Sequence, residues 1–208
     1  TDLYLDVLTN KSADAAASPE MTKVFEAFAA ARLLSEGSNV QDWNQATNLV
    51  ITGKAGGQIH GDWAQGEFQV AEQVAGEDYT CLPGLGVNEI IATGGDAFYF
   101  PVQDDPEIEA AQKELASLMI SQEVQVAFNL KKGSLPIRGD VDLSAANDCM
   151  QKGLAILAAG NVLPDGVNSF SADTQGQLDD LTVEFWNDTS ITVEDAQARY
   201  VDIIASAD

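Results

Sequence analysis

Helix-start signals recur along the chain and leave little room for long strands. Ser18-Pro19-Glu20 places a side chain that can cap a helix before a proline at the first helical position, and Asp105-Pro106-Glu107 does the same with a carboxylate. Ser121-Gln122-Glu123 supplies a third start of the same kind. Apolar residues at helical spacing follow these starts. We expect helices over residues 1–8, 18–35, 42–51, 62–70, 105–119, 121–130, 144–159, 172–187 and 193–205.

Two segments have the composition of strands. Residues 88–93 and 97–102 are rich in Ile, Phe and Tyr. Residues 10–18 are expected to form a polar connector and residues 81–86 an irregular loop. Many helices with a few short strands predict an α/β fold that is rich in helix. No internal repeat or Pro-rich linker marks a domain boundary.

The charge of the chain argues against two classes of partner. Its 208 residues carry 33 acidic and 10 basic side chains, a formal net charge of −23. Nucleic-acid phosphates and anionic lipid surfaces repel such a chain, so we expect no nucleic-acid partner. The plain interpretation of the acidic excess is a well-solvated surface. The opening residues TDLYLDV lack the basic region of a signal peptide, which predicts a mature protein or a fragment.

The sequence offers little for catalysis. His60 is the only histidine, and no G-x-S-x-G turn accompanies it. Gly84-x-Gly86 lacks the third glycine of a dinucleotide-binding motif, and there is no P-loop. With so many acidic residues, a pair of carboxylates suited to sugar hydrolysis arises by chance. We therefore expect a protein that is not an enzyme and that needs no metal or other cofactor.

Two residue types leave alternatives open. His60 is either a hydrogen-bonded structural residue or a ligand contact. Cys81 and Cys149 do not form a CxxC pair, and they are either joined in a disulfide or buried as free thiols.

The three tryptophans are candidates for ligand contact or for the core. Trp43 and Trp63 each stand at the start of an expected helix, where an indole can project into a cleft. An indole can cover the apolar face of a sugar ring, while charged or amide groups bind the hydroxyls at its edge. Trp186 lies in an apolar helix pattern with Leu181 and Phe185, and we interpret it as a core residue.

Several motifs together resemble the extracellular solute-binding proteins of sugar importers. Residues 53–64 (GKAGGQIHGDWA) are similar to a "GKAAM…GDWA" signature of that family. Residues 95–98 (GDAF) resemble its crossover strand, and residues 125–142 (QVAFN…KGSLPIRGDVD) a further conserved pattern. Asp148-Cys149 fits the glucose/mannose-type branch. The chain is identified on these motifs as the C-terminal half of a family 1 sugar-binding protein of an ABC importer.

The resemblance implies a fold and a division of the chain. Such proteins have two α/β lobes of the type II periplasmic-binding-protein kind, and the lobes close on a sugar by a hinge motion. Residues 1–92 and 132–208 would form the C-terminal lobe. Residues 93–131 would cross to the N-terminal lobe and return. The missing N-terminal half would supply most of that lobe.

The resemblance also implies a site, partners and a compartment. Trp43 and Trp63 match tryptophans that stack on the sugar in that family. Asp96 matches a carboxylate near the hinge, and Lys132 matches a lysine that donates to sugar hydroxyls. Lys131 is the alternative to Lys132. His60 remains a candidate for contact with the ligand. The expected partners are the sugar and the transmembrane permease subunits, with the protein a periplasmic monomer. An oxidising periplasm favours the Cys81–Cys149 disulfide. Arg138 is expected to bind loop carbonyls.

One departure from the family concerns the loop over residues 162–170. Glucose-type members tend to carry a histidine there, whereas this chain offers Asp165 or Asn168. The sequence leaves two other functions to consider besides sugar import. One is a sensor or adaptor lobe that docks a membrane partner, and the other is a carbohydrate-active enzyme.

Overall fold

A computed structural model describes residues 2–35, 40, 42–164, 166 and 169–208 of the chain. Its contacts divide the chain into two compact units. Unit 1 comprises Thr1–Asn39 and Leu163–Asp208, and unit 2 comprises Val40–Val162. Each unit is described separately.

Unit 1 is built from helices. They are α1 (Asp2–Asn10), α2 (Ala13–Ala16), α3 (Pro19–Leu34), α9 (Ala172–Asn187) and α10 (Val193–Ala205). Helix α10 packs against α2, α3 and α9, and α1 against α2. The starts of α3, α9 and α10 are capped by the hydroxyls of Ser18, Ser171 and Thr192, each accepting a hydrogen bond from a backbone N–H of the first turn.

The core of unit 1 is largely aromatic. Phe25 lies edge-on to Phe185 and to Tyr200, with ring centroids 5.9 and 5.6 Å apart. Phe185 and Ile204 are fully buried. Trp186, predicted as a core residue, is only partly buried and packs edge-on against Phe28, with ring centroids 5.1 Å apart.

Unit 2 contains the motifs that resemble the importer family. Its helices are α4 (Trp43–Ile51), α5 (Gln65–Val70), α6 (Pro106–Met119), α7 (Gln122–Lys132) and α8 (Asp148–Ala158), with 3-10 turns η1 (Asp62–Ala64) and η2 (Pro83–Gly86). Helix α5 packs against α4 and α7, and β1 (Ile91–Thr93) against α8. Strand β2 (Val162–Pro164) begins at the last residue of unit 2, and just before it the carbonyl of Asn161 accepts a hydrogen bond from the N–H of Ile91.

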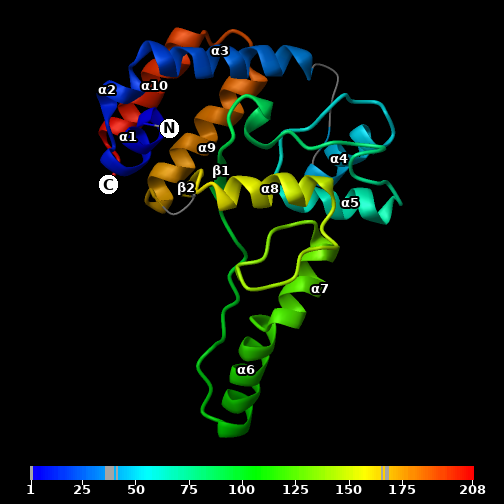
Figure 1. Cartoon of the computed structure of the whole chain (residues 1–208). Coiled ribbons are helices and arrows are strands. Elements are labelled where there is room, and N and C mark those ends of the chain that lie inside the picture. The colour runs from blue at the N-terminus through cyan, green and yellow to red at the C-terminus, as the bar shows by residue number, and fades with distance from the viewer. Residues whose placement is uncertain (1, 36–39, 41, 165, 167–168) are drawn as a thin grey trace. The chain divides into compact units, whose positions relative to one another are not determined.

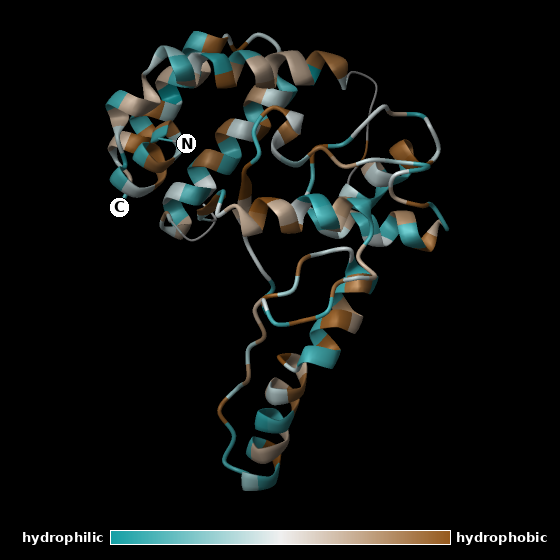
Figure 2. Ribbon diagram, viewed as in Figure 1, coloured by the Kyte–Doolittle hydropathy of each residue, from teal (hydrophilic) through white to brown (hydrophobic). Residues whose placement is uncertain are grey.

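Residues 94–132 form a segment that we call the arm. Its coil, residues 94–105, runs beside α6, and α7 follows (Figure 1). No residue of α6 is buried. Large side chains are exposed along the coil, among them Tyr99 at 90% and Val102 at 97%. Figure 2 colours parts of this coil as hydrophobic. The arm therefore presents much of its apolar surface to solvent.

The structure corrects the predicted elements in five places, one of which is the expected loop over residues 162–170, where Val162–Pro164 form β2. Residues 97–102 do not form a strand, because an extended segment needs a pairing neighbour and none of the described residues provides one. Residues 13–16, predicted as connector, form α2 under the cap of Ser12. The predicted loop over 81–86 contains η2, and α8 begins at Asp148 rather than at residue 144. The remaining helices are confirmed to within a few residues of their predicted ends.

A disulfide joins Cys81 to Cys149, with the two Cα atoms 5.3 Å apart. The disulfide expected from the family resemblance is thus confirmed, and the free-thiol alternative is wrong. The bond fastens the loop before η2 to the first turn of α8. Among the described residues, no helix is long and apolar enough to span a membrane.

Reduction of this disulfide should lower the stability of the full-length protein. The bridged cysteines are 68 residues apart in sequence. A bond that closes a loop of this size stabilises the folded state by about 4 kcal/mol at most, through the chain entropy of the unfolded state. Urea unfolding with and without dithiothreitol measures the loss. A Cys81→Ser/Cys149→Ser variant is the control: it should unfold at the lower urea concentration whether or not reductant is present.

Candidate functional site

Trp43 is held at the start of α4 by hydrogen bonds of the Gln58 side chain. Gln58 donates from Nε2 to the carbonyl of Trp43 at 3.0 Å. The Oε1 of Gln58 accepts from the hydroxyl of Thr47 at 2.7 Å, and Thr47 is fully buried. These bonds fasten the segment that ends in His60 to the first turns of α4, and so bring His60 next to Trp43.

Trp43, His60 and Trp63 form a group of three contacting rings. Trp43 and His60 are stacked, with centroids 5.0 Å apart and planes 26° apart. Trp63 meets His60 edge-on, with centroids again 5.0 Å apart and an interplanar angle of 75°. The indole Nε1–H of Trp63 donates to Nε2 of His60 at 2.9 Å. Trp43 is 42% exposed and Trp63 43%, so both indoles offer ring surface to solvent.

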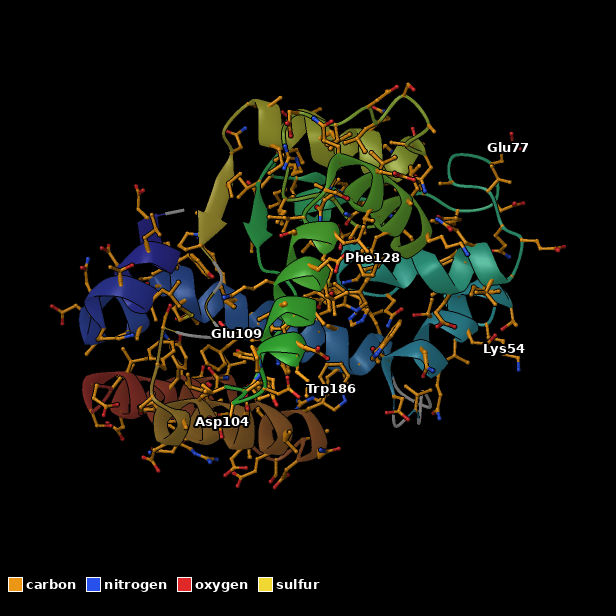
Figure 3. The ribbon with its side chains drawn as sticks, turned by 90° about the horizontal axis from the view of Figure 1, so that it is seen from below. Lys54, Glu77, Asp104, Glu109, Phe128 and Trp186 are labelled. Carbon is orange, nitrogen blue, oxygen red and sulfur yellow. A yellow bond between two sulfur atoms is a disulfide. The ribbon has the colours of Figure 1, made fainter. Side chains whose placement is uncertain are left out.

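Lys132 and Asp96 form the second group. Asp96 lies in the coil of the arm and Lys132 ends α7, and the two side chains make an ion pair. The Nζ of Lys132 also lies 5.7 Å from the ring centroid of Phe128, which Figure 3 labels on the same helix. More than half of the Asp96 side chain is exposed, so its carboxylate remains reachable.

Asp62 links the ring group to the ion pair. It stands beside Trp63 in η1, and partial desolvation raises the pKa of its carboxyl above the usual value. The charge of Lys132 and backbone N–H groups, including that of Leu135, act in the opposite direction. Asp62 is therefore within electrostatic reach of Lys132 while it neighbours an indole in sequence.

A hydrogen bond between buried groups sets the start of α5 against the end of α7. Gln65 donates from Nε2 to the carbonyl of Gly133 at 2.6 Å. Gln69 repeats the contact one turn on, donating to the carbonyl of Leu130 at 2.9 Å. Gly133 caps α7 in the left-handed conformation, with φ of 80°. Trp63 precedes α5 by two residues and Lys132 precedes Gly133, so these bonds connect the backbones that carry the two groups.

The predicted site residues thus lie in two groups within unit 2. Trp43, His60 and Trp63 come together, as do Asp96 and Lys132. Lys131 is exposed. Arg138 donates to the carboxylate of Asp140 and to the carbonyl of Ile120, in keeping with a structural role. Asp165 and Asn168 lie outside the described residues.

Sequence reasoning missed three polar residues that build the site. Gln58 lies inside the motif at 53–64 and Gln65 directly follows it, and their roles depend on partners elsewhere in the chain. Asp62 lies within the motif but was not singled out, and its surroundings include backbone N–H groups and the charge of Lys132. Within the described part of the chain, no three His, Cys, Asp or Glu side chains are placed to hold a metal ion.

Comparison with known proteins finds relatives among binding proteins. Over 162 residues, 77% of this chain, it is 36% identical to a probable sugar-binding periplasmic protein of Brucella suis. Over 137 residues, 65% of the chain, it is 40% identical to a protein of the same description from Mesorhizobium japonicum. An uncharacterised extracellular-binding protein of an ABC transporter from Pyrococcus horikoshii is 33% identical over 124 residues, 59% of the chain.

The matched regions cover only part of each relative: 38% of the Brucella protein, 32% of the Mesorhizobium protein and 27% of the Pyrococcus protein. No family model matches the chain. The chain is therefore similar to part of proteins that are described as binding proteins rather than as enzymes.

Replacement of Gly133 should disturb the junction of α5 and α7. A Gly133→Ala change puts a β-carbon into the left-handed backbone region, which costs about 1–2 kcal/mol, and against the side chain of Gln65. We expect a loss of at least that size in the free energy of unfolding, measured with urea. Gly139→Ala is the matched control, because its β-carbon would meet no atom within 4 Å. Equal stability of the two variants would contradict the assignment.

Proposed function

We propose that this chain is the C-terminal part of a periplasmic sugar-binding protein that serves an ABC importer. The observation that carries the proposal is a pair of half-exposed indoles, Trp43 and Trp63, in the same unit as the reachable Asp96–Lys132 ion pair. The descriptions of the relatives support the sugar and the periplasm, and the disulfide suits an oxidising compartment. The protein binds its ligand and does not transform it.

The two groups supply the two kinds of contact that a sugar needs. An indole covers the apolar C–H face of a pyranose or furanose ring. A carboxylate accepts from sugar hydroxyls, and an ammonium group donates to them. We propose that Trp43, Trp63, Asp96, Lys132 and His60 form the ligand surface. On binding, hydroxyl groups would take over part of the Asp96–Lys132 pairing, which costs little because the pair is exposed.

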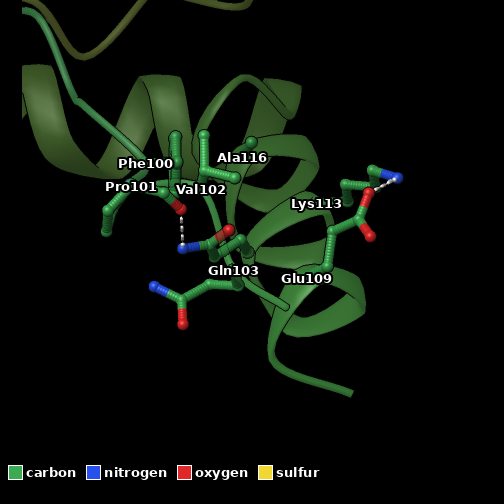
Figure 4. A pocket seen from close by; sticks show the side chains of 8 residues that line it. Phe100, Pro101, Val102, Gln103, Glu109, Lys113 and Ala116 are labelled. Atoms are coloured by element: carbon green, nitrogen blue, oxygen red, sulfur yellow. Dashed lines mark hydrogen bonds and ion pairs between the residues drawn. The ribbon is translucent and has the colours of Figure 1, made fainter. Parts of the chain in front are cut away.

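The arm supports the proposed division of the chain. We propose that residues 93–131 cross to an N-terminal lobe formed by the rest of a longer protein, while residues 1–92 and 132–208 form the C-terminal lobe. Phe100, Val102 and Ala116 line a pocket of about 430 Å³ between the arm coil and α6 (Figure 4). Such exposed apolar surface is typical of an interface with another part of the protein. In a glucose/mannose-type member, that N-terminal lobe would contribute further sugar contacts.

The first test is a thermal-shift screen of the full-length protein against mono- and disaccharides. A ligand that binds only the folded state raises the melting temperature by mass action. A shift with one aldose or a small group of related sugars would support the importer function and identify the ligand class. If no sugar shifts the melting temperature, the sensor or adaptor lobe that docks a membrane partner becomes the better interpretation.

Loss of the Trp63 indole should abolish most of the affinity. In the full-length protein, Trp63→Ala should weaken sugar binding about tenfold or more, because the stacking surface is removed. Isothermal titration calorimetry measures the dissociation constant. The melting temperature without sugar is the control for folding. Affinity within a factor of two of the unaltered protein would place Trp63 outside the site.

Neutralisation of Asp96 should weaken binding without unfolding the protein. Asp96→Asn removes a charged acceptor for hydroxyl groups, and we expect about a tenfold loss of sugar affinity. Asp104→Asn is the matched control, because Asp104 is an exposed carboxylate of the same coil (Figure 3). If both variants lose affinity equally, the effect comes from overall charge rather than from contact with the sugar.

A further inference from the structure

The contact between His60 and Trp63 defines one protonation state. An indole Nε1–H is a donor only, so Nε2 of His60 must accept in their 2.9 Å hydrogen bond. A histidine that accepts at Nε2 is neutral and carries its proton on Nδ1. Protonated His60 has an N–H at both nitrogens and cannot make this bond.

The backbone beside His60 is shaped for the same contact. Gly61 has an ordinary φ of −77°, so the backbone conformation does not require a glycine at this position. A β-carbon at residue 61 would instead collide with the six-membered ring of Trp63. The indole therefore folds back over Gly61, and it reaches His60 only because that residue has no side chain.

We infer that His60 is a positioning residue that holds both indoles of the sugar site through its neutral form. The ring of His60 stacks on Trp43 and accepts from Trp63, so it sets the separation and the relative tilt of the two. Since the Nε1–H of Trp63 is engaged by His60, Trp63 offers the sugar its ring surface rather than a hydrogen-bond donor. This inference rests on the proposed function.

The surroundings of His60 are compatible with a neutral ring. Partial burial lowers the pKa of His60 below its usual value of 6.5. Helix α4 has no charged residue within Trp43–Ile51, and Asp42 stands at its N-cap. Asp62 lies in η1 beside Trp63. As the pH falls through this lowered pKa, His60 becomes protonated and its bond to Trp63 breaks. Sugar affinity should therefore be highest at pH values above the pKa of His60.

Two substitutions separate the acceptor from the ring. His60→Gln keeps an acceptor oxygen and does not titrate, whereas His60→Phe keeps an aromatic ring and has no acceptor. Calorimetry of the full-length protein with the sugar found in the screen, from pH 8 to pH 5, gives the affinities. At pH 8 we expect His60→Phe to bind about fivefold more weakly than the unaltered protein. We expect His60→Gln, which keeps the acceptor but loses the ring stacked on Trp43, to bind more weakly than the unaltered protein and more tightly than His60→Phe.

The pH profiles decide the role of His60. The affinity of the unaltered protein should fall on acidification toward that of His60→Phe, and both variants should show flat profiles. A flat profile for the unaltered protein, or a His60→Phe variant that binds normally at pH 8, would overturn the inference.

A readout without ligand separates this inference from the proposed function. In the unliganded protein, the indole N–H resonance of Trp63, assigned with a Trp63→Phe variant, should shift as the pH falls through the pKa of His60. In His60→Phe it should stay constant. If no sugar binds at all, the proposed function fails, and this resonance still tests the contact: one that does not titrate would overturn the inference.

Discussion

The hydrogen bond from Gln65 to the carbonyl of Gly133 is the contact on which the candidate site depends. It joins the start of α5, which follows Trp63, to the end of α7, which carries Lys132. Both residues are buried, so a broken bond would leave polar groups without water or protein partners. The left-handed turn at Gly133 lets α7 end where its last carbonyls can meet Gln65 and Gln69.

Around this junction the site consists of supporting side chains that are held by hydrogen bonds and of contact side chains that are exposed to solvent. Thr47, Gln58 and Gln65 are held in place by bonds to buried or partly buried partners, and none is a candidate for ligand contact. The indoles and the Asp96–Lys132 pair, by contrast, keep surface open to solvent. A binding site gains affinity when supporting residues hold its contact groups in the bound geometry, because those groups then lose less conformational entropy on ligand binding.

Local signals predicted the helices well, and long-range partners account for the failures. Ser18, Asp105 and Ser121 cap helices as their sequence context indicated, since a cap needs only its own first turn. The segment 97–102 has strand composition but no strand, because pairing depends on a neighbour that its own residues do not encode. The motif at 53–64 likewise identified Trp63 as a candidate. The hydrogen bonds of Gln58 and Gln65 reach 15 and 68 residues along the chain and could not be inferred from spacing.

The disulfide also gives the chain a closed covalent ring. Residues 82–148 lie between the bonded cysteines, and this stretch includes the whole arm with Asp96 and Lys132. Trp43, His60 and Trp63 lie outside it, on the N-terminal side. A protease that cuts the exposed coil once would open the ring without releasing a fragment. The two pieces would stay joined through sulfur, and the nicked protein would migrate as a single species until it is reduced.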